Sequence, residues 1–245
     1  MLIANWKSNG SKAMAKNWFN KFFEKYNLKN DETFIGIAPP FVYIEQINIL
    51  KKSNINTGLQ DIEPFSGART GAISADMALD LECCFSIIGH SERRELYKES
   101  NNQIKEKIIN LDNKIIPILC VGETEKENIA GKTKQVIQNQ LEIIKDYELH
   151  DLFTVAYEPV WAIGSGKTPH AEEINEIHKF IKDVVQSIST NDLVPDVLYG
   201  GSVTHKNASS FFNQDFVDGA LIGGASLDGS IFAEIVNIYN GTKNK

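Results

Sequence analysis

The sequence predicts an α/β fold, a (β/α)₈ barrel in which outer helices surround eight parallel strands. The chain has 245 residues, of which 42% are hydrophobic, enough to bury a large core. Short apolar runs alternate with helix-patterned segments, and eight such units in roughly 250 residues are typical of this barrel. A doubly wound open sheet is the alternative, but the first turn, Asn5–Gly10, lacks the G-x-G-x-x-G pattern of that fold. Because no linker or repeat divides the sequence, we expect residues 1–245 to form a single domain.

The predicted strands are short and apolar, as expected for parallel strands that are buried on both faces. In chain order they are Leu2–Trp6, Phe34–Ala38, Asn56–Gln60, Phe85–Gly89, Ile115–Val121, Phe153–Tyr157, Asp196–Tyr199 and Val217–Ile222. Helix-patterned segments lie between them.

Between the strands, apolar residues recur at steps of three and four, which places them on one side of a helix. The clearest such stripe runs from Ile174 to Ile188. Its members are Ile174, Ile177, Ile181, Val184 and Ile188. Three shorter stripes consist of Trp18, Phe19, Phe22, Phe23 and Tyr26; of Ile137, Leu141 and Ile144; and of Ile231, Ile235 and Ile238. Each stripe predicts a helix that packs against the barrel.

Composition excludes several classes of function. The formal net charge is -7 and the pI about 5.3, so no basic field would attract nucleic acid or an anionic membrane. No apolar run approaches the ~18 residues of a membrane span. Cys83, Cys84 and Cys120 show neither metal-ligand spacing nor a paired framework, and read as reduced thiols of a cytoplasmic protein. We therefore expect no metal site.

Polar residues follow the ends of several predicted strands, where the active groups of such a barrel collect. Asn5 and Lys7 follow the first strand, His90 the fourth and Glu158 the sixth. Taken alone, Glu158 fits a salt bridge or a helix cap, His90 a structural histidine, and Lys7 a solvated surface lysine. Together they predict an acid, an imidazole and an amine that face one mouth from three strands.

Glycine-rich segments follow the last two strands, which end in Tyr-Gly-Gly-Ser and Ile-Gly-Gly-Ala-Ser. Barrels commonly hold a phosphate here with loop amides and a helix N-terminus, and glycine lets the backbone approach the anion closely. Ser202, Gly223 and Gly224 are therefore candidate phosphate-binding residues.

The segment after Glu158 reads as a movable lid. Pro159 stops the strand because it lacks a backbone donor, and Val160 and Trp161 give the segment an apolar tip. The full lid comprises Pro159, Val160, Trp161, Ala162, Ile163, Gly164, Ser165, Gly166, Lys167, Thr168 and Pro169. Its Gly-Lys-Thr triplet also invites a nucleotide P-loop reading, but that motif needs glycine where Trp161 stands.

Six motifs in order resemble the triosephosphate isomerase family over essentially the whole chain. They are ANWKSNG, IGHSERRE, LCVGE, AYEPVWAIGSGKT, YGGSV and IGGASL. The resemblance implies a TIM barrel that needs no cofactor and acts on triose phosphates in the cytoplasm, in glycolysis and gluconeogenesis. A catalytically inactive barrel that serves as a phosphate-binding or scaffold protein is one rival, although degenerate relatives usually lose one of the polar residues that are all present here. A different phosphosugar enzyme on the same barrel is another.

The resemblance also implies roles for individual residues. Glu158 would move a proton between adjacent carbons of dihydroxyacetone phosphate and glyceraldehyde 3-phosphate, and an enediolate would form between the two steps. His90, at the start of a helix that disfavours the imidazolium, would stay neutral and donate to the oxygens. Lys7 and Asn5 would stabilise the negative charge. Glu92 would either be catalytic itself or orient Lys7, and we favour orientation. Backbone amides of Gly164, Ser202, Gly223 and Gly224 would hold the phosphate.

Members of the family generally form homodimers through the loop after the third strand. In this chain Thr70 is placed to reach the partner's first-strand end. Ala72 stands where the family usually has glutamate, so a cross-interface ion pair with Arg93 cannot form, and Arg69 replaces a usual aromatic residue. We expect a dimer with rearranged polar contacts.

The far end of the lid departs from the family as well. Pro169 stands where the family commonly has alanine, whose N–H helps to hold the lid closed through the tyrosine that matches Tyr199. Proline has no N–H. We therefore expect a stiffer hinge and a weaker latch at Tyr199, and we expect Trp161 to change partners near Tyr157 and Glu123 as the lid moves.

Overall fold

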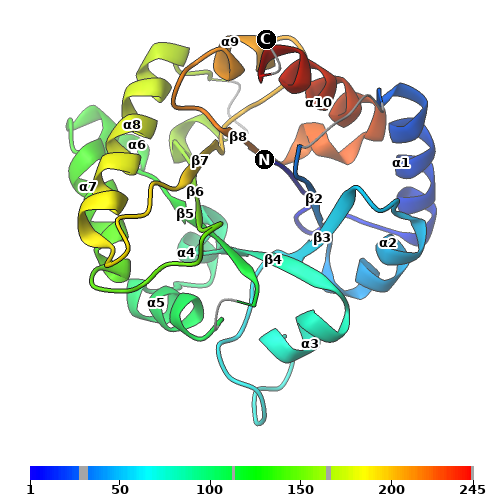
Figure 1. Cartoon of the computed structure of the whole chain (residues 1–245), viewed down its shortest axis with the longest axis horizontal. Helices are drawn as coiled ribbons and strands as arrows, with labels where there is room; N and C mark the ends of the chain where they lie inside the picture. The colour runs from blue at the N-terminus through cyan, green and yellow to red at the C-terminus, as the bar shows by residue number, and fades with distance from the viewer. Residues whose placement is uncertain (28–32, 112–113, 164–166, 244–245) are drawn as a thin grey trace.

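The computed structural model is a closed barrel whose eight strands run parallel in sequence order, with helices around the outside (Figure 1). The structure describes residues 1–27, 33–111, 114–163 and 167–243. The barrel closes where β1 pairs with β8, with Ile3 beside Leu221. The predicted (β/α)₈ fold is therefore confirmed, and the open-sheet alternative is excluded.

All eight predicted strands are present, with ends that differ by up to two residues. They are β1 Leu2–Asn5, β2 Ile35–Ala38, β3 Ile55–Leu59, β4 Cys83–Ile88, β5 Ile116–Val121, β6 Thr154–Tyr157, β7 Asp196–Tyr199 and β8 Gly219–Ile222. The predicted start of the fourth strand at Phe85 was two residues late, because Cys83 already pairs with Thr57 of β3. Its predicted end was one residue too far, since Gly89 takes φ 68° and turns the chain out of the sheet.

Helices cover the outside of the barrel. The α-helices are α1 Lys12–Lys25, α2 Ile44–Leu50, α3 Ala75–Asp80, α4 Ser91–Leu96, α5 Asn101–Ile109, α6 Glu125–Ile129, α7 Thr133–Leu141, α8 Ala171–Ile188, α9 Ala208–Phe212 and α10 Gly229–Lys243. Short 3₁₀ helices are η1 Phe41–Tyr43, η2 Glu142–Ile144, η3 Val160–Ala162 and η4 Gly224–Leu227. The stripe from Ile174 to Ile188 lies on α8, as predicted.

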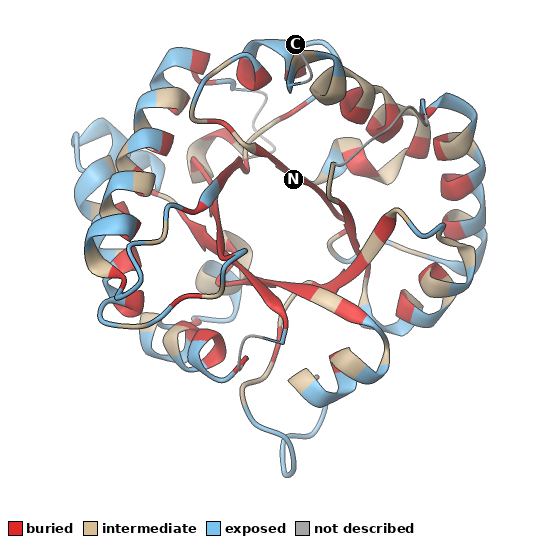
Figure 2. Ribbon diagram, in the orientation of Figure 1, coloured by how far each residue is buried: buried red, intermediate tan, exposed pale blue. Residues whose placement is uncertain are grey.

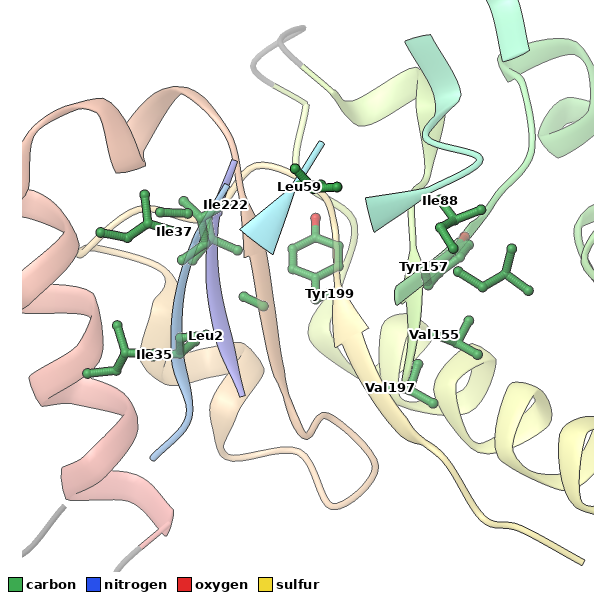
Figure 3. Packing of buried hydrophobic residues seen from close by; sticks show 14 of the residues in the cluster. Leu2, Ile35, Ile37, Leu59, Ile88, Val155, Tyr157, Val197, Tyr199 and Ile222 are labelled. Carbon is green, nitrogen blue, oxygen red and sulfur yellow. The ribbon is translucent and has the colours of Figure 1, made fainter. Parts of the chain in front are cut away.

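Apolar side chains form two layers, as alternation along buried strands requires. Ile3, Phe85 and Ile87 belong to the cluster inside the barrel. Leu2 and Ile35 belong to the larger cluster between sheet and helices, part of which is drawn in Figure 3. Figure 2 shows the strands buried and the helices exposed on their outer sides. This packing fixes the strand ends, and with them the polar residues at the mouth.

Candidate active site

A cavity of about 380 Å³ opens at the C-terminal ends of the strands, and it brings together most of the predicted site residues. Those that line it are Asn5, Lys7, His90, Glu158, Ser202, Gly223 and Gly224, and their neighbours in the wall include Ile163, Gly200, Gly201 and Ala225. Glu92 stands behind this wall and contacts it through Lys7. The predicted phosphate donor Gly164 lies outside the described residues, as do Ser165 and Gly166 of the lid.

Glu158 and His90 form a buried pair at the centre of the site. The Glu158 side chain is 2% exposed, and its Oε1 accepts a hydrogen bond from His90 Nε2 at 2.9 Å. Its Oε2 accepts the backbone N–H of Ser91, also at 2.9 Å. Burial favours the neutral acid, but His90, the Ser91 amide and Lys7 outweigh it, so the pKa of Glu158 lies below its usual value. The resting carboxylate is therefore ionised, with both oxygens engaged.

The short helix α4 fixes the tautomer of His90. His90 is its N-cap, and Nδ1 accepts the backbone N–H of Glu92 at 3.2 Å. Since Nδ1 accepts, the ring proton resides on Nε2, which faces Glu158. Burial alone would lower the pKa of His90, but the Glu158 carboxylate outweighs it and raises the pKa. The predicted place of His90 at a helix start is confirmed, while its neutrality during a reaction stays a prediction.

Lys7 is held at the end of β1 by a strained backbone and three contacts. Its φ is 50°, a left-handed backbone conformation that residues other than glycine rarely adopt. Its N–H donates to Asn5 Oδ1 at 3.0 Å, and its Nζ donates to Glu92 Oε1 at 2.6 Å. The third contact comes from Gln60, whose Nε2 donates to the carbonyl oxygen of Lys7 at 2.8 Å. The amine is thus aimed from a fixed backbone, and Glu92 lies where an orienting role requires it.

The first half of the lid is anchored on Glu123, a fully buried carboxylate that follows β5. Trp161 Nε1 donates to its Oε1 at 2.8 Å, and the Tyr157 hydroxyl donates to Oε2 at 3.1 Å. The Ser202 hydroxyl donates to the carbonyl oxygen of Ala162 at 2.9 Å. A Cβ at Gly122 would overlap the carbonyl oxygen of Glu158, so this close approach of β5 requires glycine. The partners expected for Trp161 are therefore in place around the lid base.

The second half of the lid gives no support to the P-loop reading. Lys167 is exposed, and its Nζ pairs with Glu125 Oε1 at 2.6 Å, away from the cavity. Thr168 is exposed, whereas Pro169 is buried just before α8. The Tyr199 hydroxyl is buried and finds no hydrogen-bond partner among the described residues.

Backbone forms the end of the cavity that we predict to hold a phosphate. Gly223 and Gly224 lie at the N-terminus of η4, where peptide N–H groups point outward and favour an anion. Ser226 fixes this turn, since its hydroxyl and its N–H both donate to the carbonyl oxygen of Gly223, at 2.7 and 2.8 Å. A Cβ on Gly223 would lie 3.2 Å from Lys7 Cε, so glycine also keeps the space beside the amine open.

Two other kinds of chemistry find no support here. Cys120 is buried, and burial raises the pKa of its thiol well above the ordinary value, so it is no activated nucleophile. In the part of the chain that the structure describes, no three histidine, cysteine, aspartate or glutamate side chains gather as metal ligands would.

No described helix is long and apolar enough to span a bilayer.

The loop between β3 and α3, which the resemblance assigned to a dimer interface, projects from the barrel (Figure 1). Thr70 is exposed on it. Arg93 on α4 already pairs within its own chain, with Asp61 at 2.8 Å and Glu99 at 3.5 Å. Without a partner glutamate at position 72, Arg93 therefore still has ion pairs within its own chain, although its Nε forms no hydrogen bond within the described residues.

Sequence reasoning missed three contributors to the site: the Ser91 amide, Gln60 and the guanidinium of Arg94. A backbone amide has no signature of its own in a sequence. Gln60 ends a predicted strand and could have been considered on that ground, while Arg94 stands in the quoted IGHSERRE motif. The structure shows that Arg94 donates to the carbonyl oxygens of Gly89 and Cys120 at the ends of β4 and β5.

Comparison with known proteins agrees with this geometry. The family model for triosephosphate isomerase matches residues 1–239. Curated triosephosphate isomerases are similar along nearly their full length. The chain is 42% identical to that of Baumannia cicadellinicola, over 96% of this chain and 95% of the relative. It is also 42% identical to that of Mycoplasmopsis pulmonis, over 99% and 98%, and 41% identical to that of Erwinia tasmaniensis, over 96% and 95%. The chain belongs to the triosephosphate isomerase family.

Proposed function

We propose that this chain interconverts dihydroxyacetone phosphate and D-glyceraldehyde 3-phosphate, as its family implies. The observation that carries the proposal is a single cavity that joins Glu158, His90 and Lys7 to the glycine turn at Gly223. A carboxylate beside a histidine suits proton transfer next to a carbonyl group, and the glycine turn suits a phosphate.

In this proposal Glu158 is the base. Its carboxylate takes a proton from the carbon that bears the hydroxyl, the electron pair forms an enediolate, and the same carboxyl group returns the proton to the neighbouring carbon. His90 Nε2–H gives its proton to the oxygen of the former carbonyl group, and Nε2 then takes the proton of the hydroxyl group on the neighbouring carbon, so the oxygen-bound proton also changes place and the ring ends as it began. The Lys7 ammonium stabilises the developing negative charge. No other reactant is consumed, so atoms and electrons balance.

Glu158 can act as a base only if it gives up some of the hydrogen bonds that it accepts in this structure. Both carboxylate oxygens are occupied, by His90 Nε2 and by the Ser91 N–H. To act as a base, Glu158 must release at least one of them when substrate enters. Loss of these donors removes the interactions that keep its pKa low, so the carboxylate becomes more basic as it meets the substrate.

Closure of the lid over the substrate would complete the site. Binding energy from the unreactive phosphate can be used to close Pro159–Pro169 and to exclude water from the enediolate. The contacts of Trp161 and Tyr157 with Glu123 are the ones that such a motion would exchange.

Replacement of Glu158 tests the proposal most directly. Glu158→Gln keeps the size of the side chain but removes the base, so kcat should fall at least about 10²–10⁴-fold. The measurement is a coupled assay in both directions, with circular dichroism to confirm the fold. Turnover close to that of the unchanged chain would remove Glu158 from the base role, and an unchanged chain without isomerase activity would favour the inactive-barrel rival.

We also propose that the single domain 1–245 works as a cytoplasmic homodimer, whose interface includes Thr70 and Arg93. The loop of Thr70 borders a second cavity, of about 740 Å³, and exposed apolar side chains lie nearby on Phe65 and Tyr97. A partner loop in this cavity would cover apolar surface that water now reaches.

Sedimentation equilibrium tests the dimer. A dimer at micromolar concentration is expected, and Thr70→Arg should weaken association because it adds a second bulky cation beside Arg69. An active monomer of the unchanged chain at micromolar concentration would refute the proposal.

A further inference from the structure

Arg94 makes a contact pattern that the proposed reaction does not use. It lies on α4 and points its guanidinium between two strand ends. Nε donates to the carbonyl oxygen of Gly89 at 2.7 Å, and Nη2 donates to that of Cys120 at 3.1 Å. Nη1 donates to Asn101 Oδ1, at the start of α5, at 2.7 Å. All three bonds end on neutral oxygens, so Arg94 acts here as a rigid fork of donors.

Both carbonyl groups stand one residue from the backbone that carries the acid–base pair. Gly89 directly precedes His90 at the end of β4. Cys120 directly precedes Val121, whose carbonyl oxygen accepts the backbone N–H of Glu158 at 2.7 Å. One planar group therefore links the backbone of His90 to the strand that anchors Glu158.

We propose that Arg94 is a positioning residue, which ties the end of β4 to the end of β5 and so keeps His90 Nε2 within hydrogen-bond distance of the Glu158 carboxylate. This inference rests on the proposed isomerase function. Parallel strands lack a backbone ladder beyond their last paired residues, and β4 and β5 last pair at Ile88 and Leu119. The guanidinium continues the link beyond these residues, where the site begins.

The side chain is suited to this task in a way that lysine is not. A guanidinium offers several N–H groups in one plane, whereas an ammonium is a compact point charge. Arg94 is half-buried, and this burial lowers the pKa of its guanidinium. A Cβ on Gly89 would lie 2.8 Å from Ile104 Cδ1 and 3.1 Å from Arg94 Nη2, so glycine leaves room for both side chains.

The test compares Arg94→Lys with Asn101→Ala. The second variant is a matched control, because it removes only the hydrogen bond that Arg94 Nη1 donates away from the site. Arg94→Lys should lower kcat about 10²-fold, since a misplacement near 1 Å costs about that much, and leave KM within about twofold. Asn101→Ala should change kcat less than about threefold, although both variants lose a hydrogen bond of Arg94. In Arg94→Ala, millimolar guanidinium ion should restore part of the lost kcat, and ammonium ion should not.

A second readout does not depend on turnover. In protein with ¹⁵N-labelled histidine, the Nε2–H proton resonance of His90 should move in Arg94→Lys and stay in place in Asn101→Ala. Unchanged kcat, KM and His90 resonance in Arg94→Lys, with only a lower melting temperature, would overturn the inference and leave Arg94 a stabilising residue. An unchanged chain that lacks isomerase activity would instead defeat the proposed function, and the histidine resonance would still decide the positioning role.

Discussion

Two neighbouring residues of α4 lead to two different groups of charged side chains. Glu92 pairs with Lys7 at the mouth of the barrel, in a group that we call the mouth cluster, and Arg93 pairs with Asp61 in a second group, which we call the flank cluster. The mouth cluster consists of Lys7, His90, Glu92 and Glu158, and the flank cluster of Asp61, Arg93, Glu99 and Lys107. Both contain buried charges and both border a cavity, the larger of which lies beside the flank cluster.

Buried charge and cavity size together would therefore favour the flank cluster over the mouth cluster. In the flank cluster each cation lies within ion-pair distance of each anion. Lys107 donates to Asp61 at 2.6 Å and to Glu99, and Arg93 pairs with Asp61 at 2.8 Å, while its contact with Glu99 at 3.5 Å is an ion pair without a hydrogen bond. The mouth cluster instead sets a histidine against a carboxylate and shifts their pKa values in opposite directions. We expect the chemistry where a histidine and a carboxylate with opposite pKa shifts lie beside glycine-rich backbone, and not wherever charge is buried.

The largest expected effect after loss of the base is on the stability of the flank cluster. Lys107→Met leaves two carboxylates without their shared cation, and the free energy of unfolding should fall by about 3–5 kcal/mol. Urea denaturation followed by circular dichroism measures this fall. Activity of the folded fraction should drop less than tenfold, and Lys107→Met combined with Glu99→Leu should recover part of the stability. If Lys107→Met lowered kcat more than 100-fold without changing the free energy of unfolding, the flank cluster would serve activity rather than stability, and the proposed difference between the two clusters would be wrong.

The mouth cluster should behave in the opposite way. Lys7→Ala removes a donor that faces developing charge, which is worth about 2.7–4 kcal/mol of transition-state stabilisation. Stability should change by about 1 kcal/mol or less, because the Lys7–Glu92 pair is partly exposed, 25% and 45%. Steady-state kinetics and thermal unfolding give both numbers. Glu92→Gln, the control for an orienting residue, should lose less, and a near-normal kcat/KM in Lys7→Ala would exclude Lys7 from the charge-stabilising role.

The smallest effect is expected at Tyr199, a buried polar group that belongs to neither cluster. Burial raises the pKa of its phenol, and the hydroxyl has no partner within the described parts of the chain. Pro169 cannot donate to it, since proline has no N–H. Tyr199→Phe should lower kcat less than about tenfold and leave stability equal or about 1 kcal/mol higher, because an unsatisfied hydroxyl is removed. A larger loss of kcat would reveal a partner that Tyr199 acquires when the lid closes.

Much of the site could be predicted because a parallel barrel gathers all strand ends at one mouth. Asn5, His90 and Glu158 follow different strands, and alternation of strands and helices was enough to place them together. Gln60 and the Ser91 amide escaped prediction, since their roles depend on where the first strand and the fourth strand end in space. The cross-pairing of Arg93 within its own chain escaped it for the same reason.

The sequence by itself determined the eight strands, the outer helices and the polar residues that meet at the mouth, because burial of apolar stripes and the position of polar residues after strands are properties of local order. Only the tertiary structure decided the partners: that Glu158 rests on His90 and Ser91, that Lys7 is aimed by Glu92, and that Arg94 bridges two strands. Hydrogen bonds of 2.6–3.1 Å between residues far apart in the chain depend on the curvature and closure of the barrel, which no local pattern encodes.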